Sequence, residues 1–389
     1  MTTLDEERIA ALLRSAQVPE PRVDVGRAVR DGRRRRQRRR VGGVAAVTVL
    51  AGLGVVGVVE LDGLASPKAP ARPAVAASPT AVASAAAAQP VTCEASWLPQ
   101  PIGGSVAVAN GVDPTGRYIV GDIGTGNEDG RVVLWTDGRA DVLPASARHA
   151  AAVNARGDVV GTDGGGTGWV YRNGKLRFLA TPPGYQAVLV YAVNGRGDIA
   201  GTASGAGESR QAVLWSADRP QEYRLIGRPG SAATAITEDG TVVGSMDRLP
   251  YRWTPEGTGA ALAVPDGYPH ASVDSAHGGW AIGMVPGERK GGAVQMLPVR
   301  WNLSTGAVTL LPFPGASGIA GTGDLLVDDG APLVVAPDGT SRRLPGRPEV
   351  RATEAGTYTA SGISDDALTV VGAVYENEAY RPLVWRCRR

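Results

Sequence analysis

The segment Ala152–Thr162 reads Ala-Val-Asn-Ala-Arg-Gly-Asp-Val-Val-Gly-Thr, and Ala192–Thr202 returns as Ala-Val-Asn-Gly-Arg-Gly-Asp-Ile-Ala-Gly-Thr. The two copies start 40 residues apart (192 − 152). Turn residues at fixed offsets, with short runs of Val and Ile between them, are typical of a repeated all-β unit. This repeat decides the fold class.

The same landmarks recur from Val91 to the end of the chain. Each copy has a small-residue strand ending in Asn, Asp, Ser or Thr, then a strand such as Val-Val-Gly, then a strand that ends in an aromatic residue. We find seven copies; the fifth carries Ser272 and Asp274 on its first strand, and the sixth is degenerate. Each copy spans about 42 residues, the size of one propeller blade. A closed ring covers both faces of every sheet, whereas an open solenoid, the alternative, needs capping repeats.

Aromatic residues mark the third strand of six copies. They could be mistaken for a set that stacks on carbohydrate, but their recurrence at one place in the repeat favours packing between blades. The residues predicted to pack in this way are Trp135, Tyr171, Trp215, Trp253, Trp301 and Trp385.

The two ends of the repeat region complement each other. The seventh copy stops just after Trp385, and its missing fourth strand is found in residues 93–99. The alignment places Cys387 and Cys93 at the two positions that form an Asp-Gly turn in the first copy, which predicts a disulfide there. Two unrelated thiols are the alternative. In the chain-entropy model such a long cross-link stabilises by about 5 kcal/mol. It also predicts an oxidising, extracytoplasmic location.

The first 90 residues have a different composition. Residues 41–59 contain only Val, Gly, Ala, Leu and Thr48. As a helix they would cover roughly 28 Å, near the thickness of the bilayer core. The preceding Arg33–Arg40 block is the kind of charge cluster that stays cytoplasmic. We therefore predict one transmembrane helix at 41–59, a cytoplasmic tail at 1–40 and an extracytoplasmic C-terminal domain. A cleaved signal peptide is the competing interpretation, but the basic and apolar parts are both long for one.

Two further segments flank the predicted span. Residues 60–90 are rich in Ala and Pro and predict an extended linker. Residues 3–16 predict a short amphipathic helix with acidic residues in its first turn. The helix is either a weakly ordered tail or a docking site for a cytosolic partner. The full expectation is an all-β, seven-bladed β-propeller at 91–389, closed by the N-terminal strand and the disulfide and preceded by one transmembrane helix.

Charge and motifs limit the chemistry. The net charge is only +2, and the positive charge is one local block, so no nucleic acid partner is expected. His149, His270 and His277 show no metal-ligand spacing, and no phosphate-binding loop or nucleophile motif is found. We expect no catalytic residue, cofactor or metal. Pattern-breaking positions, namely Trp280 and the insertions at 121–130 and 285–295, are the candidate ligand surface.

The repeats resemble the HAF-type extracellular repeats. The segment Gln211–Trp215 matches them at Ala212, Leu214 and Trp215, and the segment from Ala192 to Gly201 matches the part that precedes. The resemblance covers about residues 93–387. It implies a propeller exported from a bacterium, with no shared catalytic residues. The Arg-rich, Lys-poor composition is also similar to that of actinobacterial proteins.

These observations predict a membrane-anchored extracytoplasmic module that binds an envelope or extracellular ligand, either a protein or a glycan, and is not an enzyme. A propeller lyase or glycan hydrolase is one alternative. It would need polar residues from several blades to meet at the ring centre. Transmembrane signalling is another, with residues 3–16 docking a cytosolic regulator such as a sigma factor.

Overall fold

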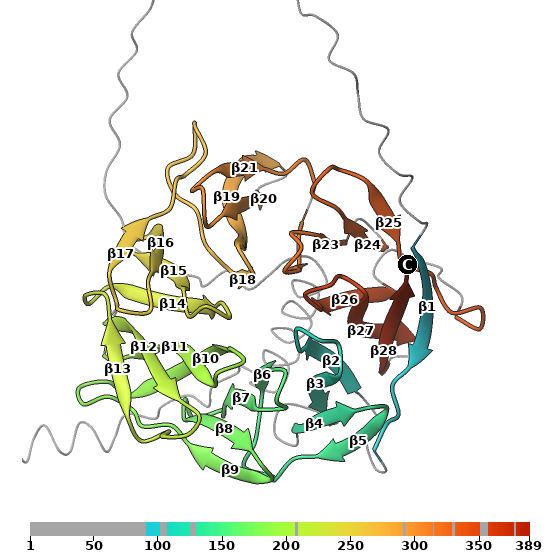
Figure 1. The fold of residues 1–389 in the computed structure, drawn as a ribbon, viewed down its shortest axis with the longest axis horizontal. Helices are drawn as coiled ribbons and strands as arrows, with labels where there is room; N and C mark the ends of the chain where they lie inside the picture. The colour runs from blue at the N-terminus through green and yellow to red at the C-terminus, as the bar shows by residue number, and fades with distance from the viewer. Residues whose placement is uncertain are drawn as a thin grey trace, which may run out of the picture. The chain divides into compact units, whose positions relative to one another are not determined.

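The architecture follows the repeat. A computed structural model describes residues 91–389 except 102–106, 125–129, 207–208, 291–292, 314, 329–330, 351–356 and 377–378. Within the described residues every regular element is a β-strand, and the strands form seven four-stranded antiparallel sheets. Figure 1 shows these sheets as blades around a common axis. The predicted all-β, seven-bladed β-propeller is confirmed.

Three blades follow one another from Ala107. Blade 1 contains β2 (Ala107–Val112), β3 (Tyr118–Ile123), β4 (Arg131–Thr136) and β5 (Arg139–Val142). Blade 2 contains β6 (Ala150–Val153), β7 (Val159–Thr162), β8 (Gly168–Arg172) and β9 (Lys175–Phe178). Blade 3 contains β10 (Ala187–Val193), β11 (Asp198–Ser204), β12 (Arg210–Ser216) and β13 (Tyr223–Ile226). In each, the first strand lies nearest the axis (Figure 1).

The next three blades repeat the order. Blade 4 contains β14 (Ser231–Ile236), β15 (Val242–Met246), β16 (Leu249–Trp253) and β17 (Gly259–Ala261). Blade 5 contains β18 (Ser275–His277), β19 (Trp280–Lys290), β20 (Ala293–Asn302) and β21 (Val308–Leu310). Blade 6 contains β22 (Gly318–Ile319), β23 (Leu325–Asp328), β24 (Pro332–Val335) and β25 (Ser341–Arg343).

Blade 7 joins the two ends of the described chain. Its order is β1 (Thr92–Trp97), β28 (Ala379–Arg388), β27 (Thr369–Glu376) and β26 (Tyr358–Ile363). β1 pairs antiparallel with β28, and Cys93 lies directly opposite Cys387. The two cysteines form a disulfide across 294 residues of sequence. The predicted closure by an N-terminal strand and a disulfide is confirmed.

The innermost strands carry a β-bulge at one repeated position. The pairing register shifts across Asn110, Ala151, Tyr191, Thr234 and Ser361 in five blades. In blade 5 the residue equivalent to these is Asp274. Gly283 faces the carbonyl of Ser272 just as Gly244 faces that of Ala232, so Ser272 corresponds to Ala232 and Asp274 to the bulged Thr234. A bulge leaves one residue outside the regular ladder and redirects its side chain.

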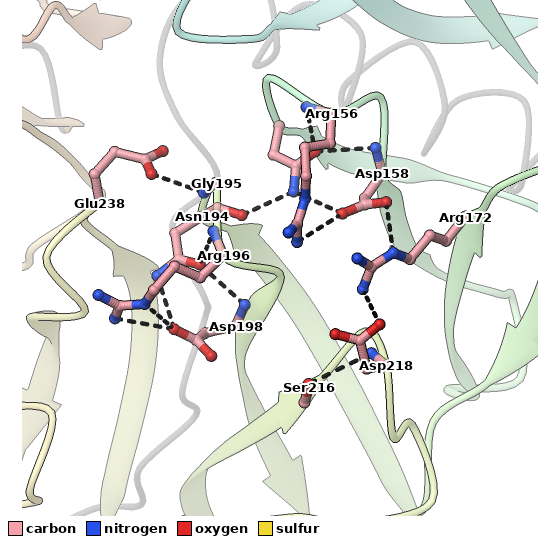
Figure 2. A network of polar contacts seen from close by, with 11 residues as sticks. Arg156, Asp158, Arg172, Asn194, Gly195, Arg196, Asp198, Ser216, Asp218 and Glu238 are labelled. Atoms are coloured by element: carbon pink, nitrogen blue, oxygen red, sulfur yellow. Dashed lines mark hydrogen bonds and ion pairs between the residues drawn. The ribbon is translucent and has the colours of Figure 1, made fainter.

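The Asn-x-Arg-Gly-Asp segments of the repeat form the turns between first and second strands. In the third blade the side-chain oxygen of Asn194 accepts hydrogen bonds from the backbone N–H groups of Arg196 and Asp198. The amide of Asn194 donates to the carbonyl of Thr237 in blade 4, and the amide of Asn154 in blade 2 donates to the carbonyl of Asn194. Figure 2 shows Asn194 with the residues of its own turn, Arg196 and Asp198. The repeated asparagines therefore close each turn and link it to the next blade.

Candidate functional site

Solvent reaches the ring axis at the innermost strand of blade 3. Leu189 and Tyr191 on β10 are 43% and 39% exposed. Strands of blades 2 and 4 contact β10 from either side, and β11 occupies its outer edge. Only the axial edge of β10 is left, so these two side chains are accessible from the axis.

Two polar residues occupy the corresponding positions of blade 5. Ser272 is exposed and Asp274 is half-buried. Because Ser272 is equivalent to Leu189 and Asp274 to Tyr191, the two pairs lie at the same levels of the ring. Thr234 is the bulged residue of blade 4, between them. We call Leu189, Tyr191, Thr234, Ser272 and Asp274 the axial site.

Hydrogen bonds between blades hold this part of the ring. The hydroxyl of Thr202 in blade 3 donates to the carbonyl of Ala233 in blade 4 at 3.2 Å. The hydroxyl of Thr234 donates to the carbonyl of Val273 in blade 5 at 2.7 Å. Since these bonds adjoin the bulged residues, the axial side chains project from a backbone fixed in position, which is what a preorganised site requires.

The electrostatics of the axial site are dominated by one acid. Burial raises the pKa of Asp274 from 3.8 to about 6, and a hydrogen bond from Ser272 partly opposes the rise. Burial also raises the pKa of the Tyr191 phenol, with nearby Arg210 acting in the opposite direction. A carboxyl group whose pKa is raised by burial is a candidate functional group.

The raised pKa predicts a pH-dependent effect of Asp274→Asn. The folded state binds the proton of Asp274 more tightly than the unfolded state does. The free energy of unfolding therefore falls as the pH rises from about 4 through 6 and Asp274 ionises. At pH 8 we expect Asp274→Asn to stabilise the chain by about 1–2 kcal/mol. At pH 4, where the folded state is protonated and the unfolded state is partly so, the difference should be much smaller than at pH 8. Thermal unfolding across this pH range measures it, and a Tm gain of equal size at pH 4 would contradict the prediction.

The structure places most of the predicted packing aromatics inside the fold. Trp135, Trp253, Trp301 and Trp385 are at most 2% exposed, and Trp215 is 3% exposed. Several of their indole N–H groups donate to carbonyls in the segment that leads into the same blade: Trp135 to Pro99, Trp215 to Ala180, Trp301 to Ala263 and Trp385 to Pro345.

Blade 2 differs from the expected pattern. Tyr171 has the register of the other aromatics, opposite Val159, but it is only partly buried. The fully buried indole is that of Trp169, two residues earlier, and it donates to the carbonyl of Arg148 at 2.8 Å. The alignment of the repeats missed Trp169, because in blade 2 the buried indole lies two residues earlier on the strand than in the other blades. Trp169 nevertheless fills the same packing role.

This displacement predicts unequal effects of two substitutions. Trp169→Phe removes the buried hydrogen bond and part of the ring, so we expect it to lower the free energy of unfolding by about 1–2 kcal/mol. Tyr171→Phe keeps the ring and should change it by less than about 0.5 kcal/mol. Denaturant unfolding of both variants compares them, and an equal loss would show that Tyr171 carries the packing role.

Other candidate residues lie away from the axial site. Trp280 packs against the core of blade 6, with the Arg300 guanidinium 4.9 Å from its ring centroid. His277 pairs with Asp365 of blade 7 at 3.1 Å. His149 is exposed and has a positive φ of 52°. Of the two insertions, the described part of 285–295 extends the β19–β20 hairpin. The structure places His277 opposite Trp280 at the β18–β19 turn, whereas His149 lies just before β6 in blade 2.

The described residues also bear on metals and membranes. No group of three or more His, Cys, Asp or Glu side chains that could hold a metal ion occurs among them. In the same part of the chain, we find no helix with the length and apolar character that crossing a bilayer requires. The predicted span at 41–59, the tail at 1–40 and the linker at 60–90 lie outside the described residues.

Comparisons with known proteins identify the architecture. No family model matches the chain, and no curated protein matches it. Among solved structures it is similar to an oligogalacturonate lyase in complex with manganese, with a TM-score of 0.52 at 9% identity over 77% of this chain and 97% of that one. A second, the Vibrio parahaemolyticus oligogalacturonate lyase, has a TM-score of 0.51 at 8% identity over 76% and 96%. At such low identity these likenesses show the fold alone.

The comparisons correct one prediction. The sequence led us to expect that the chain is not an enzyme, and the comparisons contradict this expectation, because two enzymes, both lyases, share its architecture over three quarters of its length. The likeness is one of fold and assigns no activity to this chain. The expectation depended on the absence of catalytic motifs. Propeller sites are assembled from single residues on separate blades, so a motif search along the chain does not detect them.

Proposed function

We propose that the chain is an exported propeller that binds a glycan of the cell envelope or its surroundings at the axial site. The observation that carries the proposal is the exposure of Tyr191 on an innermost strand whose sheet faces are covered, with the half-buried Asp274 at the equivalent position of blade 5. An aromatic ring and a carboxyl group at equivalent inner positions of the same ring suit a sugar, because the ring packs on its apolar face and the carboxyl group bonds its hydroxyls. Oligogalacturonate, the substrate named for the two similar lyases, is itself a saccharide.

The location is part of the same proposal. The apolar run at 41–59 after the Arg block would anchor the chain, and residues 60–90 would hold the propeller away from the membrane. The disulfide between Cys93 and Cys387 is consistent with an oxidising compartment. The resemblance to HAF-type repeats supports export in the same way. Residues 3–16 would then face the cytosol, where a regulator could dock.

Glycan binding is tested with a matched pair of tyrosine variants. Isothermal titration of the full-length chain against a panel of oligosaccharides should find a ligand, and Tyr191→Ala should weaken its binding by about tenfold or more. Tyr375→Ala is the control, because Tyr375 is a similarly exposed tyrosine, at 44%, in blade 7 on the second strand rather than at the axis. Absence of any bound glycan, or equal effects of both substitutions, would refute the proposal.

A second candidate function is cleavage of the bound glycan. Asp274 favours it, because a carboxyl with a pKa of about 6 can donate or accept a proton near neutral pH. Incubation of the wild-type chain with its glycan distinguishes the two: shortened products that Asp274→Asn fails to form support a lyase or hydrolase. An unchanged glycan at full occupancy supports binding alone.

A further inference from the structure

The charges of the inner strands differ from those expected for an acidic sugar. The seven innermost strands, β2, β6, β10, β14, β18, β22 and β26, contain neither Lys nor Arg, and their only ionisable groups are His277 and two tyrosines. Two carboxyl groups lie at the level of the bulged residues: Asp274, just before β18, and Asp122 of β3, which accepts a hydrogen bond from the side chain of Asn110. The basic side chains of the turns that follow β6 and β10, Arg156 and Arg196, pair with Asp158 and Asp198. Among the described residues, the bulged positions therefore present carboxyl groups and no basic group.

One basic residue approaches from outside the inner strands. Arg210 begins β12, the third strand of blade 3, and is near enough to Tyr191 to lower its pKa slightly. This effect is smaller than that of burial on the same phenol. A sugar carboxylate held by Arg210 would share the axial site with Asp274, which is ionised above pH 6 and would repel it.

The remaining groups of the axial site suit a neutral sugar. Leu189 and Tyr191 together provide an exposed apolar platform on blade 3. The Thr234 hydroxyl is already bonded to a backbone carbonyl, and the Ser272 hydroxyl accepts from the backbone N–H of Met284 and donates to Asp274. The Asp274 carboxyl is therefore the main polar partner left for a ligand. A hydroxyl that donates to a carboxylate forms a charge-assisted hydrogen bond, which is stronger than a neutral one.

We infer that the ligand of the axial site is an uncharged saccharide, whose ring packs on Leu189 and Tyr191 and whose hydroxyl donates to Asp274. The inference rests on the proposed glycan-binding function and narrows it to one class of sugar. The two similar structures are lyases of a polyanion, oligogalacturonate. The axial charges argue that this chain uses the shared fold for a different ligand.

The test compares sugars of equal length and different charge. The full-length chain is titrated at pH 7.5 with neutral hexasaccharides (glucan, xylan and mannan), with hexagalacturonate and with an N,N,N-trimethylated chitosan hexamer, which is cationic at this pH. We expect a neutral sugar to bind at least tenfold more tightly than either charged one. Its Kd should stay constant between about 0.05 and 0.5 M NaCl, since salt screens charge but not stacking. Tighter binding of hexagalacturonate or of the chitosan hexamer, or loss of neutral-sugar affinity with salt, overturns the inference.

Two substitutions distinguish a failure of the neutral-sugar inference from a failure of the proposed glycan-binding function. Asp274→Asn should weaken neutral-sugar binding several-fold while improving hexagalacturonate binding, because the repulsion is removed. Arg210→Gln should leave neutral-sugar binding unchanged. If Arg210→Gln instead abolishes the binding of a sugar that carries a carboxylate, glycan binding stands and the neutral class is wrong. If no saccharide binds at all, the proposed function itself fails.

Discussion

Gly244→Ala is expected to lower the free energy of unfolding by at least about 3 kcal/mol. A Cβ at residue 244 would lie 2.0 Å from the carbonyl oxygen of Ala232 and 2.9 Å from the Cα of Ala233, and both atoms belong to the backbone of the bulged strand β14. Backbone cannot rotate away as a side chain can. The innermost strand must therefore separate from β15, which strains the packing of blade 4 and breaks ladder hydrogen bonds. Thermal and denaturant unfolding measure the loss.

Gly279→Ala is the matched control. Residue 279 lies in the turn between β18 and β19, its φ is not positive, and a Cβ there meets no atom within 4 Å. The substitution should change the free energy of unfolding by less than about 0.5 kcal/mol. Comparable losses of unfolding free energy in the two variants would show that the close backbone contact at residue 244 is not the reason why glycine is required there.

The same contact accounts for the repeated glycine and for its one exception. An added Cβ would lie within 2.4 Å of a backbone carbonyl oxygen of the innermost strand, or of the residues just before it, at each of Gly121, Gly161, Gly201, Gly283 and Gly372. In blade 6 the corresponding residue is Val327. There the innermost strand is only Gly318–Ile319, and its pairing stops at Leu326, so no strand crosses residue 327. The sixth copy looks degenerate in sequence because its inner strand is short.

The sequence was sufficient to predict the ring, because closure depends on features with fixed spacing. The number of repeated turns predicted the number of blades. The last copy lacks a fourth strand, and residues 93–99 match the sequence expected for that strand. The match of Cys93 with Cys387 followed from the same alignment, and the structure pairs them in that register. Each of these features depends on position along the chain, which a repeat preserves.

The axial site was missed because its residues differ from blade to blade. We aligned Asp274 with turn residues such as Asn194, whereas the structure makes it equivalent to Tyr191 and puts His277 at the turn. Blade 5 has a shorter turn, in which His277 pairs with Trp280, so its landmarks shift by three residues (277 − 274). Bulges add a residue without any mark in the sequence. Only the register of the strands shows which side chains face the axis.

Removal of the disulfide is the second substitution with a large expected effect. In the other blades a hairpin turn joins the third strand to the fourth, as Asp137-Gly138 does in blade 1. In blade 7 the fourth strand β1 comes from the other end of the propeller, and only the Cys93–Cys387 bond joins it covalently to β28. Because the cysteines are separated by 294 positions in the sequence, the bond restricts the unfolded chain strongly. Cys93→Ala/Cys387→Ala should therefore lower the free energy of unfolding by about 3–5 kcal/mol.

The reductant provides an internal control for this prediction. Adding dithiothreitol to the wild-type chain should lower its Tm to that of the double-alanine variant, and the variant itself should not respond. Limited proteolysis should then cut first within or just before β1, because that strand is held at one edge of blade 7 by its pairing with β28. If the double variant and the oxidised wild type unfold at the same temperature, strand pairing alone closes the ring.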